Sequence, residues 1–254
     1  YNSGLGRGAF AASGTGALVY TTIERPVTQL TWFDRGGNQI GHLDGSVSYY
    51  GPSFSRDGKK LAAARVDLDI GTPDLWSIDV TRGMAQRLTN DPRLDISPVW
   101  SPDGETLVFA GQSPGTPPNL FRKAIGVAGD GENLVRSRYN DQPTDWSPDG
   151  QFVIYSRRDP QLQWDLWLKP MSPGAERTEA PFLRPATNEH LAQFSPDGRW
   201  VAYVSDDSGT NEVYAQSFPK PGTREQISNG GGSQPRWRAD GRELFYLSAD
   251  GHLV

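Results

Sequence analysis

The sequence contains no cysteine, only three histidines, and no apolar run of the ~18 residues that a membrane-spanning helix needs. The absence of cysteine excludes disulfides, thiolate zinc sites, iron–sulfur clusters and cysteine nucleophiles. No stretch repeats apolar residues with the sustained spacing of a helix, so we predict almost no helix. The chain also lacks a signal-peptide pattern and an initiator methionine, and we interpret it as a segment of a larger protein.

The composition that is present is typical of a folded, turn-rich chain. Glycine and proline together make up about 19% of the 254 residues, below the ~25–30% at which disorder is expected. Aromatic residues make up 11%, enough for a core. The net charge of −5 argues against a nucleic-acid groove or an anionic membrane surface as partner.

An Asp-Gly pair recurs along the chain at a nearly constant spacing. Successive Asp residues are 46, 46, 48 and 43 positions apart, and a large aromatic residue stands three positions before each of them. The aromatic and acidic residues are Phe54 and Asp57, Trp100 and Asp103, Trp146 and Asp149, Phe194 and Asp197, and Trp237 and Asp240. A degenerate copy, Ser13–Gly16, precedes them. Five matches at one period indicate a repeat fold.

Each repeat predicts four strands. Ser-Pro-Asp-Gly forms a tight turn, because proline presets φ and glycine accepts positive φ. The turn is flanked by β-branched and aromatic runs such as Thr106–Phe109 and Trp200–Val204, which predict buried strands. The third strand of each repeat opens with an acid or an amide, and a weaker fourth strand follows it. We assign structural hydrogen bonding to these opening residues: Asp74, Asn119, Asp165 and Glu212.

Four strands in about 46 residues, repeated, predict an all-β fold: a six-bladed β-propeller of four-stranded antiparallel blades. A solenoid is the alternative, but its coils are usually shorter. We expect residues 1–254 to form a single domain with blades at about 9–45, 48–90, 95–137, 141–185, 189–229 and 232–254. The last blade is incomplete. Its missing strands lie either beyond residue 254, which we favour, or in residues 1–8.

The repeats resemble the WD40-like repeats of the TolB type over nearly the whole chain. The resemblance is closest to the propeller that lies C-terminal to a kinase and a membrane span in some bacterial serine/threonine kinases. The residues that carry it are Leu30–Arg35, Asn188 and Glu189, Phe194–Tyr203 and Gly230–Trp237. The resemblance implies an extracytoplasmic or periplasmic propeller that senses or binds a partner. The kinase motifs themselves are absent from this sequence.

No motif predicts a catalytic, cofactor-binding or metal site. Gly111–Gly115 matches the G-x-S-x-G pattern of a nucleophile elbow, but the prolines that follow cannot open the helix that such an elbow requires. The three histidines, His42, His190 and His252, have no recognisable triad partners. Asp67–Asp74 resembles the start of a calcium loop but lacks its closing glutamate. We also interpret the recurrent tryptophans as inter-blade core: Trp100, Trp146 and Trp237.

The candidate binding site is the mouth of the propeller channel. The loops that enter first strands and those that join second to third strands gather there, and their residues differ from blade to blade, as recognition requires. Converging acids would favour a cation or a basic peptide, although an ordinary solvated rim is an equally good reading. The candidate residues are Tyr49, Tyr50, Asp95, Asn140, Asp141, Arg157, Arg158, Asn188 and Glu189.

We therefore expect a non-catalytic propeller that binds a protein, peptide or small molecule and needs no cofactor. It would serve as the sensor or scaffold module of a larger bacterial protein, with no nucleic-acid partner and no membrane insertion by this segment. Two alternatives stay open. One is a propeller that gates substrate access to a peptidase of the prolyl oligopeptidase kind, and the other is an enzyme, such as a lyase or glycosidase, that uses the channel mouth.

Overall fold

The structure, a computed structural model, describes residues 10–12, 18–24, 27–43, 47–66, 72–159, 163–172 and 178–254, with side chains from residue 29 onward. Three sequence predictions lie outside these residues: the degenerate repeat at 13–16, most of the calcium-loop pattern at 67–74, and residues 1–8 as a closing segment. The described residues form strands and turns and contain no helix, as predicted.

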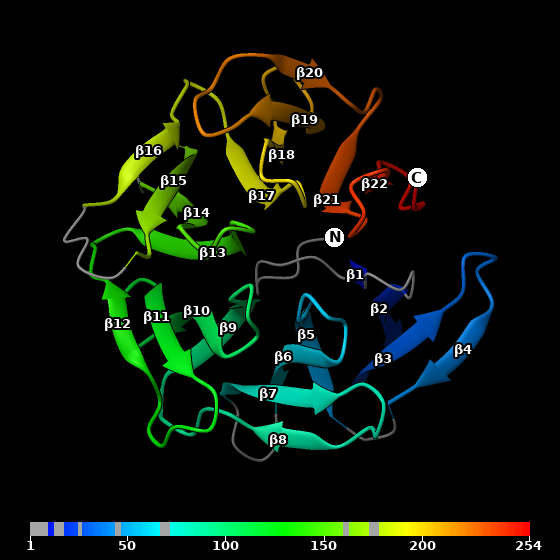
Figure 1. Ribbon diagram of the computed structural model, residues 1–254, viewed down its shortest axis with the longest axis vertical. Coiled ribbons are helices and arrows are strands. Elements are labelled where there is room, and N and C mark those ends of the chain that lie inside the picture. Colours follow the sequence, from blue (N-terminus) through cyan, green and yellow to red (C-terminus); the bar gives the residue numbers. More distant parts are fainter. Residues whose placement is uncertain are drawn as a thin grey trace. The chain divides into compact units, whose positions relative to one another are not determined.

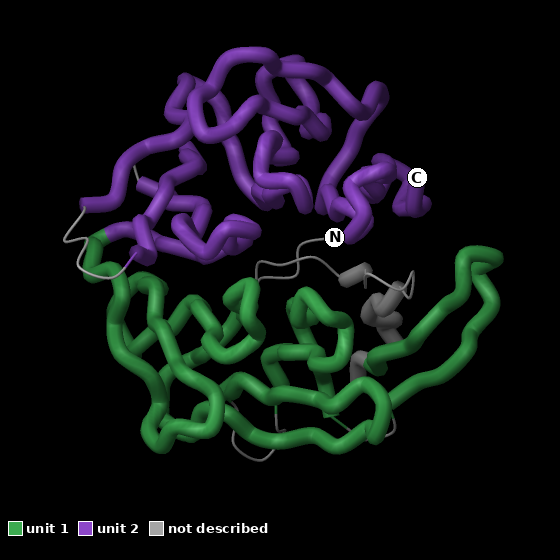
Figure 2. The backbone as a smooth tube through the Cα atoms, viewed as in Figure 1, with its two compact units in different colours: residues 1–138 green, residues 139–254 purple. Residues whose placement is uncertain are grey.

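The chain separates into two compact units, residues 1–138 and residues 139–254 (Figure 2). The boundary falls between the third and fourth predicted blades. Within each unit the sheets follow one another along the chain, and every sheet pairs its strands in chain order (Figure 1). The expectation of a single domain stays a prediction.

The first unit contains three four-stranded antiparallel sheets. The first sheet is β1 (Phe10–Ala12), β2 (Leu18–Glu24), β3 (Val27–Phe33) and β4 (Gln39–His42). The second is β5 (Ser48–Phe54), β6 (Lys60–Val66), β7 (Pro73–Asp79) and β8 (Ala85–Arg87). The third is β9 (Leu94–Trp100), β10 (Thr106–Gln112), β11 (Asn119–Ala124) and β12 (Glu132–Val135).

The second unit contains two four-stranded sheets and one two-stranded sheet. The fourth sheet is β13 (Asn140–Trp146), β14 (Phe152–Arg158), β15 (Trp164–Pro170) and β16 (Ala180–Leu183). The fifth is β17 (Glu189–Phe194), β18 (Trp200–Ser205), β19 (Glu212–Ser217) and β20 (Arg224–Gln226). The sixth is β21 (Gly232–Trp237) and β22 (Leu244–Ser248).

The sequence predicted six four-stranded blades with the last one incomplete, and six complete four-stranded sheets are not formed by the described residues. The described residues form five four-stranded sheets and one two-stranded sheet, because β22 is followed only by a tight turn and an isolated bridge between Leu247 and Leu253. The Val254 amide donates to the Tyr246 carbonyl at 2.9 Å, which is the beginning of a third strand. The side chains of β22 are half-buried, whereas the middle of the second strand is buried in the second to fifth sheets.

The Ser-Pro-Asp-Gly turns owe their shape to a repeated set of hydrogen bonds. In the third sheet the Ser101 hydroxyl donates to Asp103 and accepts the Thr106 amide at 2.9 Å. Gly104 has a φ of 71° and donates its amide to the Ser101 carbonyl at 2.9 Å. The same serine–aspartate contact recurs at Ser55, Ser147 and Ser195. The turn therefore connects the first and second strands in the same way in each of these sheets.

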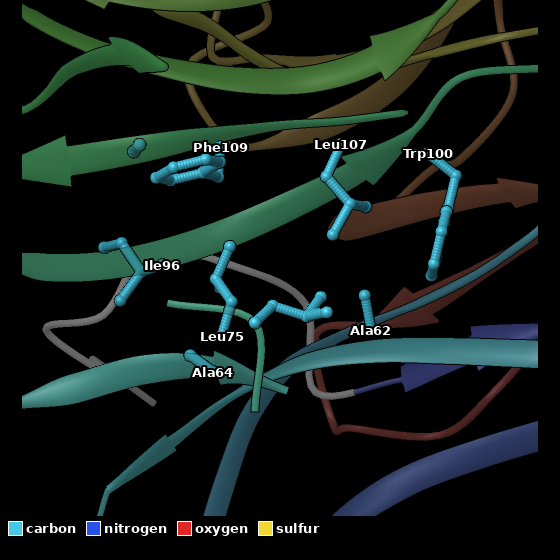
Figure 3. Packing of buried hydrophobic residues seen from close by; sticks show 9 residues of the cluster. Ala62, Ala64, Leu75, Ile96, Trp100, Leu107 and Phe109 are labelled. Atoms are coloured by element: carbon cyan, nitrogen blue, oxygen red, sulfur yellow. The ribbon is translucent and has the colours of Figure 1, made fainter. Parts of the chain in front are cut away.

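Neighbouring sheets within a unit pack face to face through apolar side chains. In the first unit, Ala62 and Leu75 of the second sheet lie against Ile96, Trp100 and Phe109 of the third (Figure 3). In the second unit, Ile154 and Leu166 of the fourth sheet belong to one cluster with Phe194 and Tyr203 of the fifth. The second and third sheets, and the fourth and fifth, thus bury apolar faces against each other, as the repeat predicts.

The recurrent tryptophans support this packing in two of three cases. Trp100 is buried, and its Nε1 donates to the Ser53 carbonyl of the preceding sheet at 3.0 Å. The Nε1 of Trp237 donates to the Gln193 carbonyl at 3.3 Å, also in the preceding sheet. The Nε1 of Trp146 donates instead to Gly150 in its own turn, at 3.1 Å.

A bulge interrupts the first strand of each sheet from the second to the sixth. It lies between Pro143 and Asp145 in the fourth sheet, and begins three positions before the aromatic residue in the second, third, fifth and sixth. Ser97, Leu191 and Gln234 adopt a φ of 55° there, as does Gly51. Non-glycine residues rarely enter this left-handed region. The bulge places two residues opposite one on the second strand, and no residue type at this position reveals it in the sequence.

Candidate functional site

The predicted site residues lie at one end of their sheets, where strands begin and end. Because the first and second strands are antiparallel, the start of the first strand and the end of the second meet there. In the first unit this end of the sheets carries Tyr49 and Tyr50 of β5 and Asp95 of β9. In the second unit it carries residues of β13, β14 and β17, with Asn188 directly before β17: Asn140, Asp141, Arg157, Arg158, Asn188 and Glu189.

One register position is shared by four of these residues. Tyr49 pairs with Arg65, Asp95 with Gly111, Asp141 with Arg157, and Glu189 with Ser205. Three successive sheets thus carry an acid at the start of their first strand, and we call Asp95, Asp141 and Glu189 the first-strand acids. Their exposed fractions are 0%, 0% and 2%, so each carboxyl needs partners within the protein or a raised pKa.

Asp141 is fully paired with Arg157. Its Oδ1 accepts Arg157 Nε at 2.7 Å and its Oδ2 accepts Nη2 at 3.0 Å, a bidentate contact. The guanidinium also lies 4.5 Å from the Trp167 ring centroid and 3.6 Å from a Glu179 oxygen. Burial lowers the pKa of Arg157, but the Asp141 carboxylate raises it by more, so the net shift is upward. The two charges satisfy each other, so this pair stabilises the second unit.

Glu189 is only half satisfied. Its Oε1 accepts the hydroxyls of Thr187 and Ser205, both at 2.8 Å. Its Oε2 has no hydrogen-bond partner among the described residues. Burial raises the pKa of Glu189 to about 7, against the lowering effect of the two hydroxyls, and the charges of Asp165 and Asp206 raise it further. The Oε2 atom therefore lacks a hydrogen bond that a buried carboxyl oxygen ordinarily makes.

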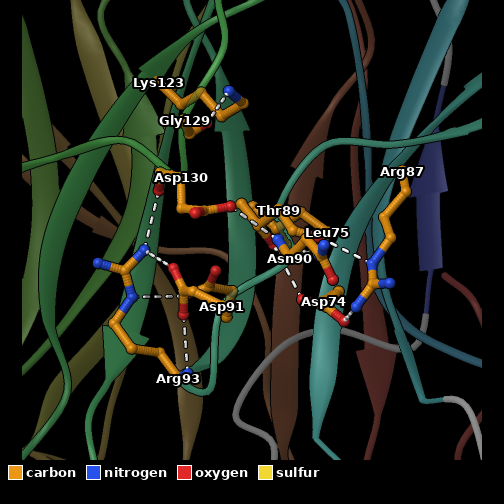
Figure 4. A network of polar contacts seen from close by, with 11 residues as sticks. Asp74, Leu75, Arg87, Thr89, Asn90, Asp91, Arg93, Lys123, Gly129 and Asp130 are labelled. Atoms are coloured by element: carbon orange, nitrogen blue, oxygen red, sulfur yellow. Dashed lines mark hydrogen bonds and ion pairs between the residues drawn. The ribbon is translucent and has the colours of Figure 1, made fainter. Parts of the chain in front are cut away.

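Asp95 has fewer contacts still. Neither carboxylate oxygen has a hydrogen-bond partner among the described residues, and the nearest cation is Arg93 Nε, 3.5 Å from Oδ1. Burial raises the pKa of Asp95 to about 7, although the Arg93 charge and the Thr89 hydroxyl lower it. Arg93 is itself engaged with Asp91 and with the Asp130 carbonyl at 2.8 Å (Figure 4). The ion pair between Asp95 and Arg93 is therefore weak, because Arg93 makes its shorter contacts with other groups.

The other predicted residues have smaller roles. Tyr49 is 4% exposed and packs with Leu30 and Leu61, and burial raises its pKa. Tyr50 is half-buried against the core between the second and third sheets. Asn188 links two segments, because its amide groups donate to Asp206 and its Oδ1 accepts the Trp164 amide at 3.1 Å.

Asn140 and Arg158 complete the predicted set. The Oδ1 of Asn140 accepts Gln142 Nε2 at 3.2 Å. Arg158 is exposed, with its guanidinium 5.9 Å from the Trp164 ring centroid. Of the nine predicted residues, Arg158 alone presents a charge at the surface.

The acid or amide that opens each third strand has the structural role predicted for it. Each holds the segment that leads to the next sheet. Asp74 bonds Arg87 and lies near Thr89 (Figure 4), Asn119 accepts the Ser137 amide at 2.6 Å, and Asp165 pairs with Arg184 at 3.3 Å. Glu212 accepts the amides of Gly230 and Gly231, each at 2.8 Å.

Sequence reasoning missed a recurrent contact between a guanidinium and the aromatic residue of the third strand. The arginines come from three different places in the repeat: the second strand, the segment before the first strand, and the fourth strand. The sequence shows the aromatic residues at one period but gives no such signal for the arginines. The pairs are Arg65 and Trp76 at 4.1 Å, Arg93 and Phe121 at 4.0 Å, Arg157 and Trp167 at 4.5 Å, and Arg224 and Tyr214 at 4.0 Å.

The remaining motifs lie in ordinary surroundings. Gly111–Gly115 covers the end of β10 and a turn in which the Thr116 amide bonds the Ser113 carbonyl at 3.1 Å, and no helix follows. His42 and His252 are exposed, while burial lowers the pKa of His190 to about 4. The described residues contain no cluster of three metal-binding side chains. They also contain no helix long and apolar enough to cross a membrane.

Solved structures similar to this chain share its fold. TolB from Acinetobacter baumannii is 20% identical with a TM-score of 0.67, and the match covers 96% of this chain but only 55% of that one. An oligogalacturonate lyase from Vibrio parahaemolyticus is 14% identical with a TM-score of 0.66, covering 97% of this chain and 75% of that one.

A third similar structure comes from a study of two prolyl endopeptidases. It is 17% identical with a TM-score of 0.59, and the match covers 95% of this chain and 39% of that one. At these identities the likeness shows a β-propeller fold and leaves the chemistry open.

A family model assigns the chain more specifically. The model described as the TolB beta propeller domain matches residues 17–178, well over half of the chain. Its span includes the repeats with Ser-Pro-Asp-Gly turns at Asp103 and Asp149 and the related turn at Asp57. This protein therefore belongs to the TolB β-propeller domain family.

Proposed function

We propose that this chain is a non-catalytic binding module that recognises a cationic group of a protein or peptide through the buried acid Glu189 of its second unit. The observation that carries the proposal is Glu189, a buried carboxyl whose Oε2 has no hydrogen-bond partner among the described residues. A buried acceptor without a donor is costly, and a partner's ammonium or guanidinium would remove that cost. Such a contact is charge-assisted and therefore strong.

The three first-strand acids contribute differently to this proposal. Glu189 is the leading binding residue of the second unit, and Arg158 lies at the surface at the same end of the neighbouring sheet. Asp95 is the corresponding residue of the first unit. Asp141 is assigned to stability, because Arg157 already occupies both of its oxygens. The candidate site is thus narrower than the nine residues predicted from the sequence.

Capture of a partner from a bacterial periplasmic extract tests the proposal. Glu189→Gln keeps the shape of the side chain and removes its charge, so we expect the captured partner to bind about 10- to 100-fold more weakly. Glu132→Gln changes an exposed acid elsewhere and serves as the matched control. Equal affinity of the wild-type chain and Glu189→Gln for that partner would reject Glu189 as the binding residue.

The wider setting is also part of the proposal. We propose a six-bladed propeller that acts outside the cytoplasm as the sensor or scaffold module of a larger bacterial protein, such as a membrane-bound serine/threonine kinase. Support for six blades comes from the repeat period and from the third strand that begins at Leu253. Support for the location comes from the family, by resemblance. The sequence of the parent gene would test the kinase setting.

Two alternatives rest on particular similar structures. This chain covers 39% of the prolyl endopeptidase structure. The remaining length of that protein leaves room for a separate hydrolase domain, to which a propeller like this one would gate access. The oligogalacturonate lyase structure favours an enzyme that uses the channel mouth. A hydrolase domain in the parent protein would support the first alternative. Turnover of an oligogalacturonate by the purified chain would support the second.

A further inference from the structure

The segment between β20 and β21 contains the one Asn-Gly bond of the sequence, Asn229–Gly230. Both residues are exposed. Glycine leaves its backbone nitrogen unhindered, so this dipeptide is the one most prone to lose ammonia from the asparagine side chain. Gly230 has a φ of 88°, which other residues rarely adopt, so the local conformation favours keeping the glycine.

The reaction at such a bond is a cyclisation followed by hydrolysis. The Gly230 nitrogen forms a bond to Asn229 Cγ, the bond from Cγ to the side-chain nitrogen breaks, and ammonia leaves with the proton of the Gly230 amide. Water then opens the resulting succinimide at either carbonyl, giving aspartate or isoaspartate. The sequence consumes one water, releases one ammonia and needs no other reactant.

Glu212 holds the nitrogen that must attack. Its Oε1 accepts the Gly230 amide at 2.8 Å and the Gly231 amide at the same distance. The carboxylate is 2% exposed and also accepts the Ser228 hydroxyl. Burial raises the pKa of Glu212, but these hydrogen bonds lower it by more, so the net shift is downward. The carboxylate therefore stays ionised at neutral pH. The Gly230 N–H is therefore engaged in a charge-assisted bond.

The Asp-Gly bonds of the repeat turns are protected against the same cyclisation in a different way. In the third sheet, the Gly104 amide donates to the Ser101 carbonyl at 2.9 Å. The hydroxyl of Ser101 lowers the pKa of Asp103, and an ionised carboxylate is a poorer electrophile than an amide. Asn229 cannot ionise in this way. The bond from Gly230 to Glu212 is the one restraint that the described contacts place on its reacting atoms.

We propose that Asn229 is a deamidation site and that Glu212 sets its rate by holding the Gly230 amide. This inference is independent of the binding function proposed above. It concerns the attachment of the sixth sheet, because Gly232 is the first residue of β21 and donates its amide to the Asn211 carbonyl at 2.8 Å.

Conversion would disturb that attachment in two ways. Aspartate at position 229 would place a second carboxylate close to Glu212. Isoaspartate would lengthen the backbone by one methylene beside two tightly packed glycines. A Cβ at Gly231 would lie 2.7 Å from Ala249 Cβ, and one at Gly232 would lie 2.3 Å from Ser228 Oγ. We expect faster amide hydrogen exchange in β21 after conversion.

The experiment is peptide mapping by mass spectrometry of the full chain during incubation at neutral pH, with isoaspartate detected enzymatically. We expect conversion at Asn229 ahead of every other asparagine. Glu212→Ala should accelerate it about tenfold, as expected for losing one charge-assisted hydrogen bond. Glu212→Gln keeps an acceptor oxygen but loses its charge, so its rate should lie between those of the wild-type chain and Glu212→Ala.

Ser228→Ala separates this role from general loosening of the loop, since it removes a different contact of the same carboxylate. It should leave the rate near that of the wild-type chain. The proposal is wrong if Asn229 is not the residue converted, if Glu212→Ala leaves its rate unchanged, or if Ser228→Ala accelerates conversion as much as Glu212→Ala. None of these outcomes bears on partner capture by Glu189.

Discussion

At the residue scale, the first-strand acids share one position in the repeat but differ in what surrounds them. Asp141 has an arginine opposite it on the second strand, Glu189 has a serine, and Asp95 has a glycine. The residue opposite therefore decides whether the buried carboxylate is paired with a cation, as in Asp141, or has its pKa raised by burial, as in Glu189 and Asp95. The sequence predicted all three as ligand-binding residues, because it shows the acids but does not show which of them is paired.

Removing Asp141 should destabilise the second unit strongly. In Asp141→Ala the guanidinium of Arg157, 8% exposed, loses its bidentate partner. Breaking a buried pair in this way costs about 3–5 kcal/mol, and denaturant unfolding would measure the loss. Glu132→Ala breaks the exposed pair with Arg122 and should cost less than about 1 kcal/mol. Similar losses for both variants would contradict the assignment of Asp141 to stability.

At the element scale, a tight turn and a bulge define the first strand of a repeat. The turn is predictable because serine, aspartate and glycine each have a fixed task in it, which the hydrogen bonds of Ser101 and Asp103 display. The bulge is not predictable, since glycine, serine, leucine and glutamine occupy it in different sheets. Strand positions follow from residue type, whereas this local backbone change follows from the register of the whole sheet.

The serine of the turn should matter more than an exposed serine. Ser101→Ala leaves the Thr106 amide without its acceptor in a nearly buried turn, which should cost about 1–2 kcal/mol. Ser172→Ala, at an exposed position, should change the free energy of unfolding by less than about 0.5 kcal/mol. Urea unfolding of the two variants checks this, and equal midpoints would count against the role of the hydroxyl.

At the scale of the whole molecule, the period of the repeat predicted an all-β propeller, and the family match and solved structures confirm that class. The sequence did not predict two compact units, nor the arginine beside the third-strand aromatic residue in the second to fifth sheets, which comes from the second strand, the fourth strand or the segment before the first strand. Periodicity detects what every repeat shares. Contacts that each repeat makes with a residue of its own, including those of the candidate site, need the structure.

Packing between sheets should dominate the stability of the first unit. Trp100 is 5% exposed and lies in the cluster between the second and third sheets, so Trp100→Ala should cost about 3–5 kcal/mol. Trp164 is half-buried and belongs to no such cluster, so Trp164→Ala serves as the comparison and should cost clearly less. Thermal unfolding of both variants measures the difference. A larger loss in Trp164→Ala would contradict the stacking of sheets through the recurrent aromatic.

The central claim is that Glu189 is a buried carboxyl with an oxygen left for a partner, and NMR titration of its side-chain carboxyl tests it most directly. The account predicts a pKa of about 7 in the free protein, raised from the ordinary 4.5 by burial. The folded chain then binds the proton more tightly than the unfolded chain, so stability falls as pH rises between these values, and Glu189→Gln lacks that fall. A Glu189 carboxyl that titrates near 4.5 would contradict the claim.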